Sequence, residues 1–290
     1  MDINLPLFLS TCIDGVVMGL IYSLVGIGLS LVFSLMGILN FAHISFMVIC
    51  IYLCVSIHEI IGNTLISLAG GVIIYILFGF LVYTFFIIPI FKFGLDAAMM
   101  NTFALSYFIE VLILYIFGPF YKKPIMILPN IEIKLFGILT YSSYRLSVAF
   151  ISIIILLFLF YFIKKSMFGI ALRAVTQDLT ASFLVGINPK KITMYGFLIS
   201  ILITGIAGIL VSPLYIVSPT AYDRFLPISF AVAIVGGLGN IEGALVAGLM
   251  IGLIESLGSV YISSVYKDVI IFVILMLTLL VRPKGIFGRR

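Results

Sequence analysis

Few side chains in this chain of 290 residues could make or break covalent bonds. Its two histidines, His43 and His58, stand in no spacing typical of a nucleophile triad or of a zinc-binding helix. No GxxxxGKS or GxxxxGKT segment is present, so the chain lacks the loop that cradles ATP phosphates in many ATPases. The cysteines, Cys12, Cys50 and Cys54, lie in apolar runs and are interpreted as small buried side chains. We therefore predict no catalytic, cofactor-binding or metal-binding residues, and no enzyme.

Two acidic residues lie inside apolar segments, where a charge is unfavourable. They are Glu110, in the run FALSYFIEVLILYIF, and Glu255, in the run GALVAGLMIGLIESL. One interpretation is a proton or cation site. The other is a structural carboxylate that is protonated or hydrogen-bonded, near an interface or inside a helical bundle. An ion-coupled carrier usually pairs such acids with arginine or lysine near the membrane centre, and the sequence shows no such partner.

The composition that surrounds these residues is typical of a membrane protein. The chain is 63% hydrophobic and 9% charged, with a mean hydropathy of +1.36. A helix needs about 20 apolar residues to cross a bilayer, and several runs have that length. The alternating segments of a β-barrel are missing. We predict an all-α, polytopic membrane protein with eight or nine spans. The expected spans are 12–33, 41–57, 64–91, 97–117, 144–163, 193–218, 225–236 with 242–258, and 268–281.

Basic residues set the predicted orientation, because lysine and arginine close to spans stay on the cytoplasmic side. The polar segment 164–192 carries five of them and is placed inside. Alternation of the spans then puts Lys92 inside and the N-terminus outside. It puts the C-terminal tail inside as well, provided that 225–258 crosses twice. A single crossing would put the four basic residues of the tail outside, so we favour two crossings. Residues 118–144 are an outer connection with a short strand-like piece, Ile131–Leu135.

The segment 164–192 also predicts a compact helix. Asp178 is placed to cap a helix from Leu179 to Val185, and Gly186 is placed to end it. Asn188 and Pro189 are suited to cap and begin the next span. Apolar side chains recur every four residues, which predicts one stripe that packs either on another protein or under the chain's own spans. The stripe consists of Ala171, Val175, Leu179, Phe183 and Ile187.

Glycine-containing breaks interrupt two apolar regions, at Gly37–His43 and at Gly236–Gly243. In the first break, Asn40 is a candidate cap for the second span. Transporters use such breaks to gate a path, and non-helical backbone is tolerated at membrane depth where it is buried or lines a cavity. The alternative is a plain cytoplasmic turn at each break. Two GxxxG spacings also predict close helix contacts, one from Gly15 to Gly19 and one from Gly248 to Gly252.

Five stretches together resemble one known family, the LivH-type permease subunits of branched-chain amino acid ABC importers. They are GLIYSLVGIGLSLVFSLMGILNFAH (19–43), ALRAVTQDLTASFLVGINPKKI (171–192), GIAGIL (205–210), AVAIVGGLGNIEGALVAGLMIGLIE (231–255) and YKDVIIFVILMLTLLVRPKGIFG (266–288). They follow the family's order and cover well over a third of the chain. The resemblance implies that residues 1–290 form a single transmembrane permease domain, with a cytoplasmic coupling region at about 164–192.

The resemblance further implies partners. A second, unlike permease subunit of LivM type would complete the translocation path. Two cytosolic ATPase subunits would consume ATP, and a periplasmic or extracytoplasmic solute-binding protein would deliver the substrate. The chain would lie in the lipid of the bacterial cytoplasmic (inner) membrane, with no nucleic-acid partner. The residues implied at the ATPase contact are Arg173, Gln177, Asp178, Leu179, Ala181, Phe183, Gly186, Ile187 and Asn188.

The family's NFAH element and the two glycine breaks supply candidates for the translocation path or its gates. These candidates are Asn40, Phe41, His43, Gly236, Gly237 and Gly239. The expected function is the membrane-spanning permease subunit of an ATP-driven importer for branched-chain or other hydrophobic amino acids. The alternative is a stand-alone, ion-coupled secondary transporter of a small solute, in which Glu110 or Glu255 would be required.

Overall fold

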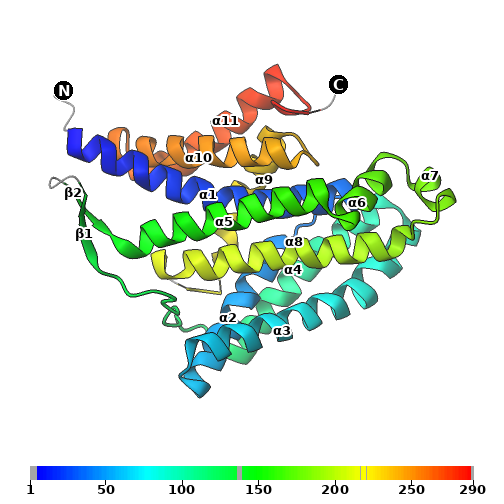
Figure 1. Ribbon diagram of the computed structural model, residues 1–290, viewed down its shortest axis with the longest axis horizontal. Helices are drawn as coiled ribbons and strands as arrows, with labels where there is room; N and C mark the ends of the chain where they lie inside the picture. The colour runs from blue at the N-terminus through cyan, green and yellow to red at the C-terminus, as the bar shows by residue number, and fades with distance from the viewer. Residues whose placement is uncertain (1–4, 136–138, 216, 220, 289–290) are drawn as a thin grey trace. The chain divides into compact units, whose positions relative to one another are not determined.

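The computed structural model describes residues 5–135, 139–215, 217–219 and 221–288. The described chain is mostly helical, with one short antiparallel hairpin (Figure 1). The first elements are, in order, α1 (Leu5–Met36), α2 (His43–Ile61), α3 (Thr64–Val82), a π-helix (Tyr83–Ile87), a 3-10 helix (Ile88–Phe93), α4 (Leu95–Phe117), β1 (Glu132–Leu135) and β2 (Leu139–Ser142). They are followed by α5 (Ser143–Lys165), α6 (Met167–Gln177), α7 (Leu179–Leu184), α8 (Pro189–Val211), a 3-10 helix (Ser212–Leu214), α9 (Ala221–Gly236), α10 (Ile241–Tyr261), a 3-10 helix (Ser264–Tyr266) and α11 (Lys267–Val281).

Among the described residues, eight helices are long and apolar enough to cross a membrane. A shorter apolar helix, Arg224–Gly236, lies between two of them. This pattern confirms the predicted class, an all-α multi-pass membrane protein, and agrees with the expected eight or nine spans. The expected span 64–91 is not one regular α-helix. Helix α3 continues into a short π-helix and then into a short 3-10 helix. Pro89 lies in this 3-10 helix and has no N–H with which to continue an α-helix.

The chain forms two compact units. Unit 1 comprises Met1–Ile27, Met126–Ile154 and Pro227–Arg290, and unit 2 comprises Gly28–Ile125 and Ile155–Leu226. Both units are assembled from segments that are distant in sequence, and α1, α5 and α9 each contribute residues to both.

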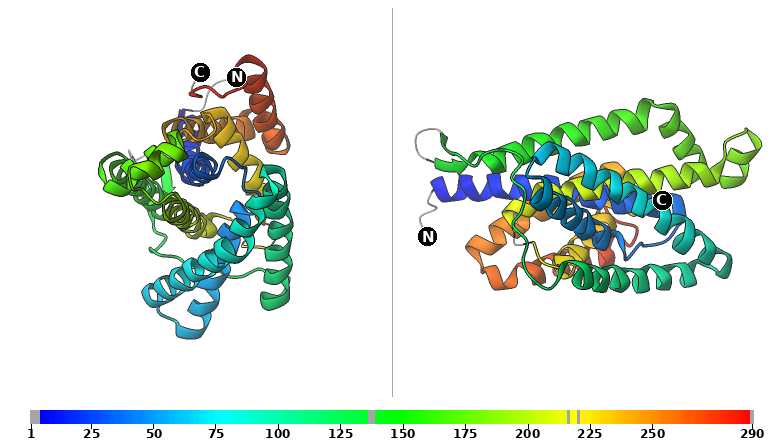
Figure 2. Two further views of the ribbon diagram at one scale, coloured as in Figure 1. Left: turned by 90° about the vertical axis from the view of Figure 1, so that its right-hand side faces the viewer. Right: turned by 90° about the horizontal axis from the view of Figure 1, so that it is seen from below.

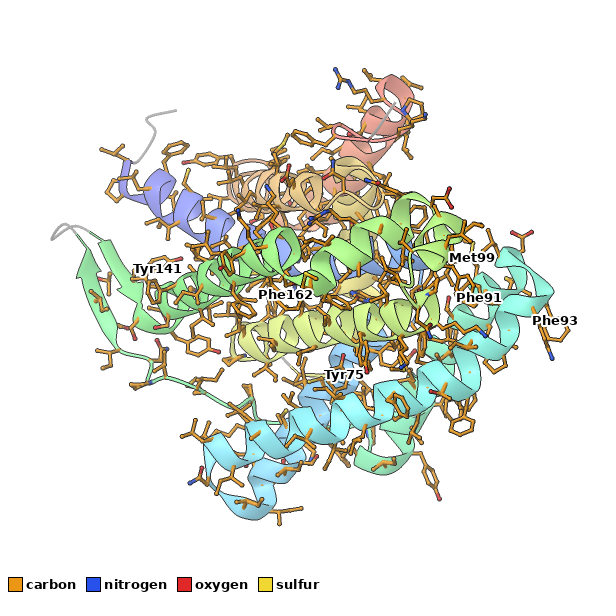
Figure 3. All side chains as sticks on the ribbon, turned by 45° about the vertical axis from the view of Figure 1, so that its right-hand side comes forward. Tyr75, Phe91, Phe93, Met99, Tyr141 and Phe162 are labelled. Carbon is orange, nitrogen blue, oxygen red and sulfur yellow. The ribbon has the colours of Figure 1, made fainter. Side chains whose placement is uncertain are left out.

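In unit 2, α2 is largely buried and packs against α3, α4 and α8. Tyr75 lies between α3 and α8 (Figure 3), and its hydroxyl donates a 2.8 Å hydrogen bond to the carbonyl of Ile201. Gly71 makes close contact possible between α3 and α2, because a Cβ there would lie 2.8 Å from the Cα of Cys54. The turn before α4 and helix α7 lie at the same end of this unit (Figures 1 and 2). That end carries Lys92, as the predicted orientation requires.

In unit 1, the two GxxxG segments pack against each other. A Cβ on Gly252 would lie 2.4 Å from the Cα of Gly19, and one on Gly15 would lie 2.9 Å from the Cα of Leu253. The backbones of α1 and α10 therefore approach as closely as glycine alone permits. Polar bonds join the same pair of helices, because the hydroxyl of Ser23 donates to the carbonyl of Leu245 at 2.9 Å.

The expected strand Ile131–Leu135 is present as β1, and β2 is its antiparallel partner, with Glu132 opposite Ser142. The partner strand was not predicted. The hairpin is tied to α1, because the hydroxyl of Tyr141 donates to Asp14 Oδ1 at 2.5 Å, and the Arg145 guanidinium pairs with the same carboxylate. Figure 3 shows Tyr141 at the base of this hairpin.

Candidate functional site

The predicted coupling segment contains two helices, α6 and α7, where one was expected. Ser166 caps α6 by accepting a 3.0 Å bond from the N–H of Gly169. Asp178 then adopts extended backbone, with φ at −153°, and separates α6 from α7. The prediction of one continuous apolar stripe is therefore wrong, since its first two members lie on α6 and its third and fourth on α7. Val175 of this stripe is buried, whereas Leu179 and Phe183 are exposed.

The caps of α7 are confirmed. The side chain of Asp178 accepts hydrogen bonds from the N–H groups of Thr180 and Ala181, at 2.8 and 2.9 Å. At the other end Gly186 has φ at +85°, and its N–H donates to the carbonyl of Phe183 at 3.1 Å. The N–H of Ile187 donates to the carbonyl of Ser182, which completes a Schellman motif. The helix ends at Leu184, one residue earlier than predicted.

The next cap is also confirmed. Asn188 accepts a 3.3 Å bond from the N–H of Lys191, and Pro189 is the first residue of α8. A chain of three capped helices results, in which α7 is held by its ends and presents its apolar side chains outward. Phe183 is 67% exposed and Leu184 is 81% exposed. A short, capped helix with exposed apolar side chains is suited to bind another protein.

Arg173, one of the predicted coupling residues, has a structural role that the sequence did not indicate. Its guanidinium donates to the carbonyl of Ile163 and, at 3.4 Å, to that of Lys164. These carbonyls belong to the last turn of α5, which lacks partners within the helix. Arg173 therefore fastens α6 to the end of α5.

The break at Gly37–His43 lies inside unit 2. Asn40 was predicted to cap α2, but the residue in the N-cap position is Ala42, which offers no side-chain bond. Asn40 instead accepts a 3.1 Å bond from the N–H of Ala42, two residues on, and so forms an Asx turn that leads into the helix. The N–H of Phe41 donates to Thr102 Oγ1 at 3.2 Å and attaches the turn to α4.

His43 joins three helices of unit 2. Its Nε2 lies 2.7 Å from Thr204 Oγ1 on α8, and both side chains are fully buried. Gly28 of α1 leaves room for this pair, because a Cβ there would lie 2.4 Å from Thr204 Oγ1. Ser200 Oγ donates to the carbonyl of Gly28 at 2.6 Å. Thr204 and Ser200 could not be singled out from the sequence, since single hydroxyls in apolar runs are common.

The depth of this cluster follows from helix geometry. Gly28 precedes the end of α1 at Met36 by about 12 Å of helix. The backbone between Met36 and His43 therefore turns back into the bundle, and Asn40 and Ala42 are buried there. The break at this position is therefore packed inside the bundle, and a role in a translocation path or gate stays a prediction.

The glycine break at Gly236–Gly243 lies in unit 1 and receives the C-terminal tail. Gly237 and Gly239 have positive φ, at +97° and +81°. Asn240 caps α10 by accepting from the N–H of Gly243 at 3.0 Å, and its Nδ2 donates to the carbonyl of Phe287 at 2.8 Å. A Cβ on Gly236 would lie 2.6 Å from the backbone of Gly243. Packing of the tail accounts for Gly237, and the close approach of α10 accounts for Gly236, while a role in gating stays a prediction.

The buried acid Glu255 also has a structural partner, because the hydroxyl of Tyr22 donates to its Oε2 at 2.6 Å. This bond joins α10 to α1 next to the glycine contact. Glu110 is half-buried on α4. Among the described residues, no three histidine, cysteine, aspartate or glutamate side chains come together as a metal site.

The fold combines apolar helices of spanning length with a polar break buried in the bundle and an exposed, capped helix outside it. This combination is typical of a multi-pass membrane permease. The chain belongs to the family described as "Branched-chain amino acid transport system / permease component", whose profile matches residues 11–279.

The chain is similar over nearly its whole length to proteins of this family. It is 29% identical to the high-affinity branched-chain amino acid transport system permease protein LivH of Salmonella typhimurium and to that of Escherichia coli K12, covering 97% of this chain and 96% of each relative. It is 28% identical to BraD of Pseudomonas aeruginosa, with the same coverage.

A solved structure, PsaBC from Streptococcus pneumoniae in complex with Fab, has a similar fold. The TM-score is 0.53 at 16% identity, over 96% of this chain and 92% of that one.

Proposed function

We propose that this chain is the membrane-spanning permease subunit of an ATP-driven importer for branched-chain or other hydrophobic amino acids. The observation that carries the proposal is α7, a doubly capped helix that exposes Phe183 and Leu184. Family membership adds the substrate class, because the relatives are permeases of branched-chain amino acid transport.

The proposed assembly contains a second, LivM-type permease subunit, two cytosolic ATPase subunits that use ATP, and an extracytoplasmic solute-binding protein. It lies in the bacterial cytoplasmic membrane, where the basic segment 164–192 faces the cytosol. The residues that would meet the ATPase include the side chains of α7 itself, Leu179, Ala181 and Phe183. Gln177 and the capping residues Asp178, Gly186, Ile187 and Asn188 would hold α7 in place.

The structure supports a route by which a push on α7 reaches the interior of unit 2. Helix α7 continues through the Schellman turn and the Asn188 cap into α8. Helix α6 packs on the same helix, with Leu172 close to Gly196. Further along α8, Thr204 bonds to His43 at the start of α2. A movement of α7 and α8 would therefore shift the buried break, as alternating access requires.

A cysteine crosslink tests the docking. Phe183→Cys is expected to crosslink to an ATPase subunit encoded beside this chain, and Ser264→Cys, on the exposed turn before α11, is the matched control that should not. Uptake of labelled leucine by the assembled importer should require ATP. Uptake by the purified chain alone, driven by an ion gradient, would favour a secondary transporter and overturn the proposal.

A further inference from the structure

The start of α2 brings together several buried N–H donors that lack an acceptor. Asn40 is 1% exposed, and its Nδ2 has no hydrogen-bond partner among the described residues. The backbone N–H groups of Ile44 and Ser45 belong to the first helical turn, where no acceptor within the helix exists. Both residues are buried, and the hydrogen bonds of the described chain include none from these two N–H groups.

The donors lie together at one end of α2. Asn40 Oδ1 accepts from the N–H of Ala42, so the carboxamide of Asn40 lies beside the N-terminal end of α2. The 19 residues of α2 give this end the positive side of a helix dipole. The hydrogen-bond partners of this segment on α4 and α8 are neutral, namely the hydroxyls of Thr102 and Thr204 and the carbonyl of Ser106. Buried donors at a helix N-terminus favour an anion with two acceptor oxygens.

We infer that the N-terminus of α2, with the amide of Asn40, binds the α-carboxylate of the amino acid as it passes through unit 2. The inference rests on the proposed function and adds the group that the permease recognises. A carboxylate accepts from Asn40 Nδ2 with one oxygen and from the N–H groups of Ile44 and Ser45 with the other. The site is closed in this structure, so the ligand reaches it when the break moves as described above.

This arrangement also explains the role of His43. The imidazole does not need to touch the ligand, because its Nε2 is engaged with Thr204 on α8. It connects the donor cluster to the helix that α7 would move. Recognition of the carboxylate by neutral donors does not depend on the side chain of the transported amino acid. It therefore suits a permease that carries several amino acids, since every one of them has this group.

Histidine spectroscopy tests the site directly, because the chain has only two histidines and His58 can be replaced for assignment. The full chain is labelled with ¹⁵N-histidine and titrated with leucine and with leucinamide, which lacks the carboxylate. Leucine is expected to shift the His43 ring signals, and leucinamide is not. Equal shifts from both compounds, or no shift from leucine, would overturn the inference.

Substitutions at Asn40 supply the second readout. Asn40→Asp keeps the oxygen that accepts from Ala42 but replaces the donor with a negative charge. It should raise the leucine concentration at half-maximal shift at least about tenfold. Asn40→Ser retains an acceptor without added charge, in case the aspartate variant folds poorly. Asn63→Asp is the matched control, because Asn63 is an exposed N-cap on α3.

The two proposals fail separately. If the assembled importer takes up leucine with ATP but Asn40→Asp and Asn40→Ser leave the half-maximal leucine concentrations for uptake and for the His43 shift unchanged, the carboxylate site is wrong and the proposed function stands. If the wild-type assembly takes up neither branched-chain nor other hydrophobic amino acids with ATP, the proposed function itself fails.

Discussion

At the scale of single residues, adjacent glycines can have opposite roles. Gly70 and Gly71 follow each other on α3, yet the first has only the tip of Ile57 within 4.0 Å of an added Cβ, whereas the second faces the backbone of Cys54. Gly70→Ala should stabilise unit 2 by about 0.5–1 kcal/mol, because alanine is the better helix former. Gly71→Ala should destabilise it by about 1–3 kcal/mol through overpacking. Thermal unfolding in detergent measures both, and equal effects would show that α2 and α3 are not in close contact.

Glu255 is a second residue whose environment decides its role. Its carboxylate receives the hydroxyl of Tyr22 inside unit 1, and glutamine can accept the same bond. Glu255→Gln should therefore leave leucine uptake by the assembly unchanged, whereas Tyr22→Phe should lower stability by about 1–3 kcal/mol by leaving a buried acceptor without this bond. Uptake and thermal unfolding are measured on both variants. Loss of uptake in Glu255→Gln with normal stability would point to proton or cation coupling.

At the scale of secondary-structure elements, α7 depends on its caps because six residues form a marginal helix. Asp178→Ala removes the acceptor for Thr180 and Ala181 and should weaken the helix by about 1 kcal/mol. Hydrogen exchange at those two amides should accelerate, and ATP-driven uptake should fall while the rest of the chain stays folded. Asp178→Asn keeps an acceptor oxygen and serves as the control. Unchanged exchange in Asp178→Ala would mean that α7 is held by other contacts.

The β1–β2 hairpin gives a prediction about pH. Burial, and after it the hydrogen bond to Asp14, raise the pKa of Tyr141, which is 6% exposed. The folded state holds the proton of the Tyr141 hydroxyl more tightly than the unfolded chain does. This hydroxyl therefore contributes fully to the free energy of unfolding below the unfolded pKa of about 10, and its contribution is lost as pH rises above that value. Compared with Tyr141→Phe, the wild-type chain should lose about 1.4 kcal/mol per pH unit above about pH 10. Parallel curves for the two proteins would contradict the buried bond.

At the scale of the whole molecule, the sequence predicted class and caps better than it predicted placement. Long apolar runs identify spans, because the bilayer sets their length, and Asp178, Gly186 and Asn188 identify helix ends, because caps are local. The path of the chain around Asn40 could not be derived, since the inward turn depends on Gly28 and Thr204, which are distant in sequence. The separation of α6 from α7 was missed because a four-residue period continues across Asp178.

The number of crossings is the remaining property of the whole chain, and the tail of unit 1 bears on it. The N–H of Ile286 donates to the carbonyl of Val235 at 2.8 Å, so the tail lies beside the turn between α9 and α10. Helices α10 and α11 thus lead away from that turn and return to it, so the tail and this turn lie on the same side of the membrane. With the three native cysteines replaced, Lys284→Cys and Phe183→Cys should react with an impermeant thiol reagent in inverted vesicles only. Ser264→Cys, on the exposed turn between α10 and α11, should react in intact cells. Labelling of Lys284→Cys from outside would mean a single crossing at 225–258, and labelling of Phe183→Cys from outside would remove α7 from the reach of any cytosolic ATPase.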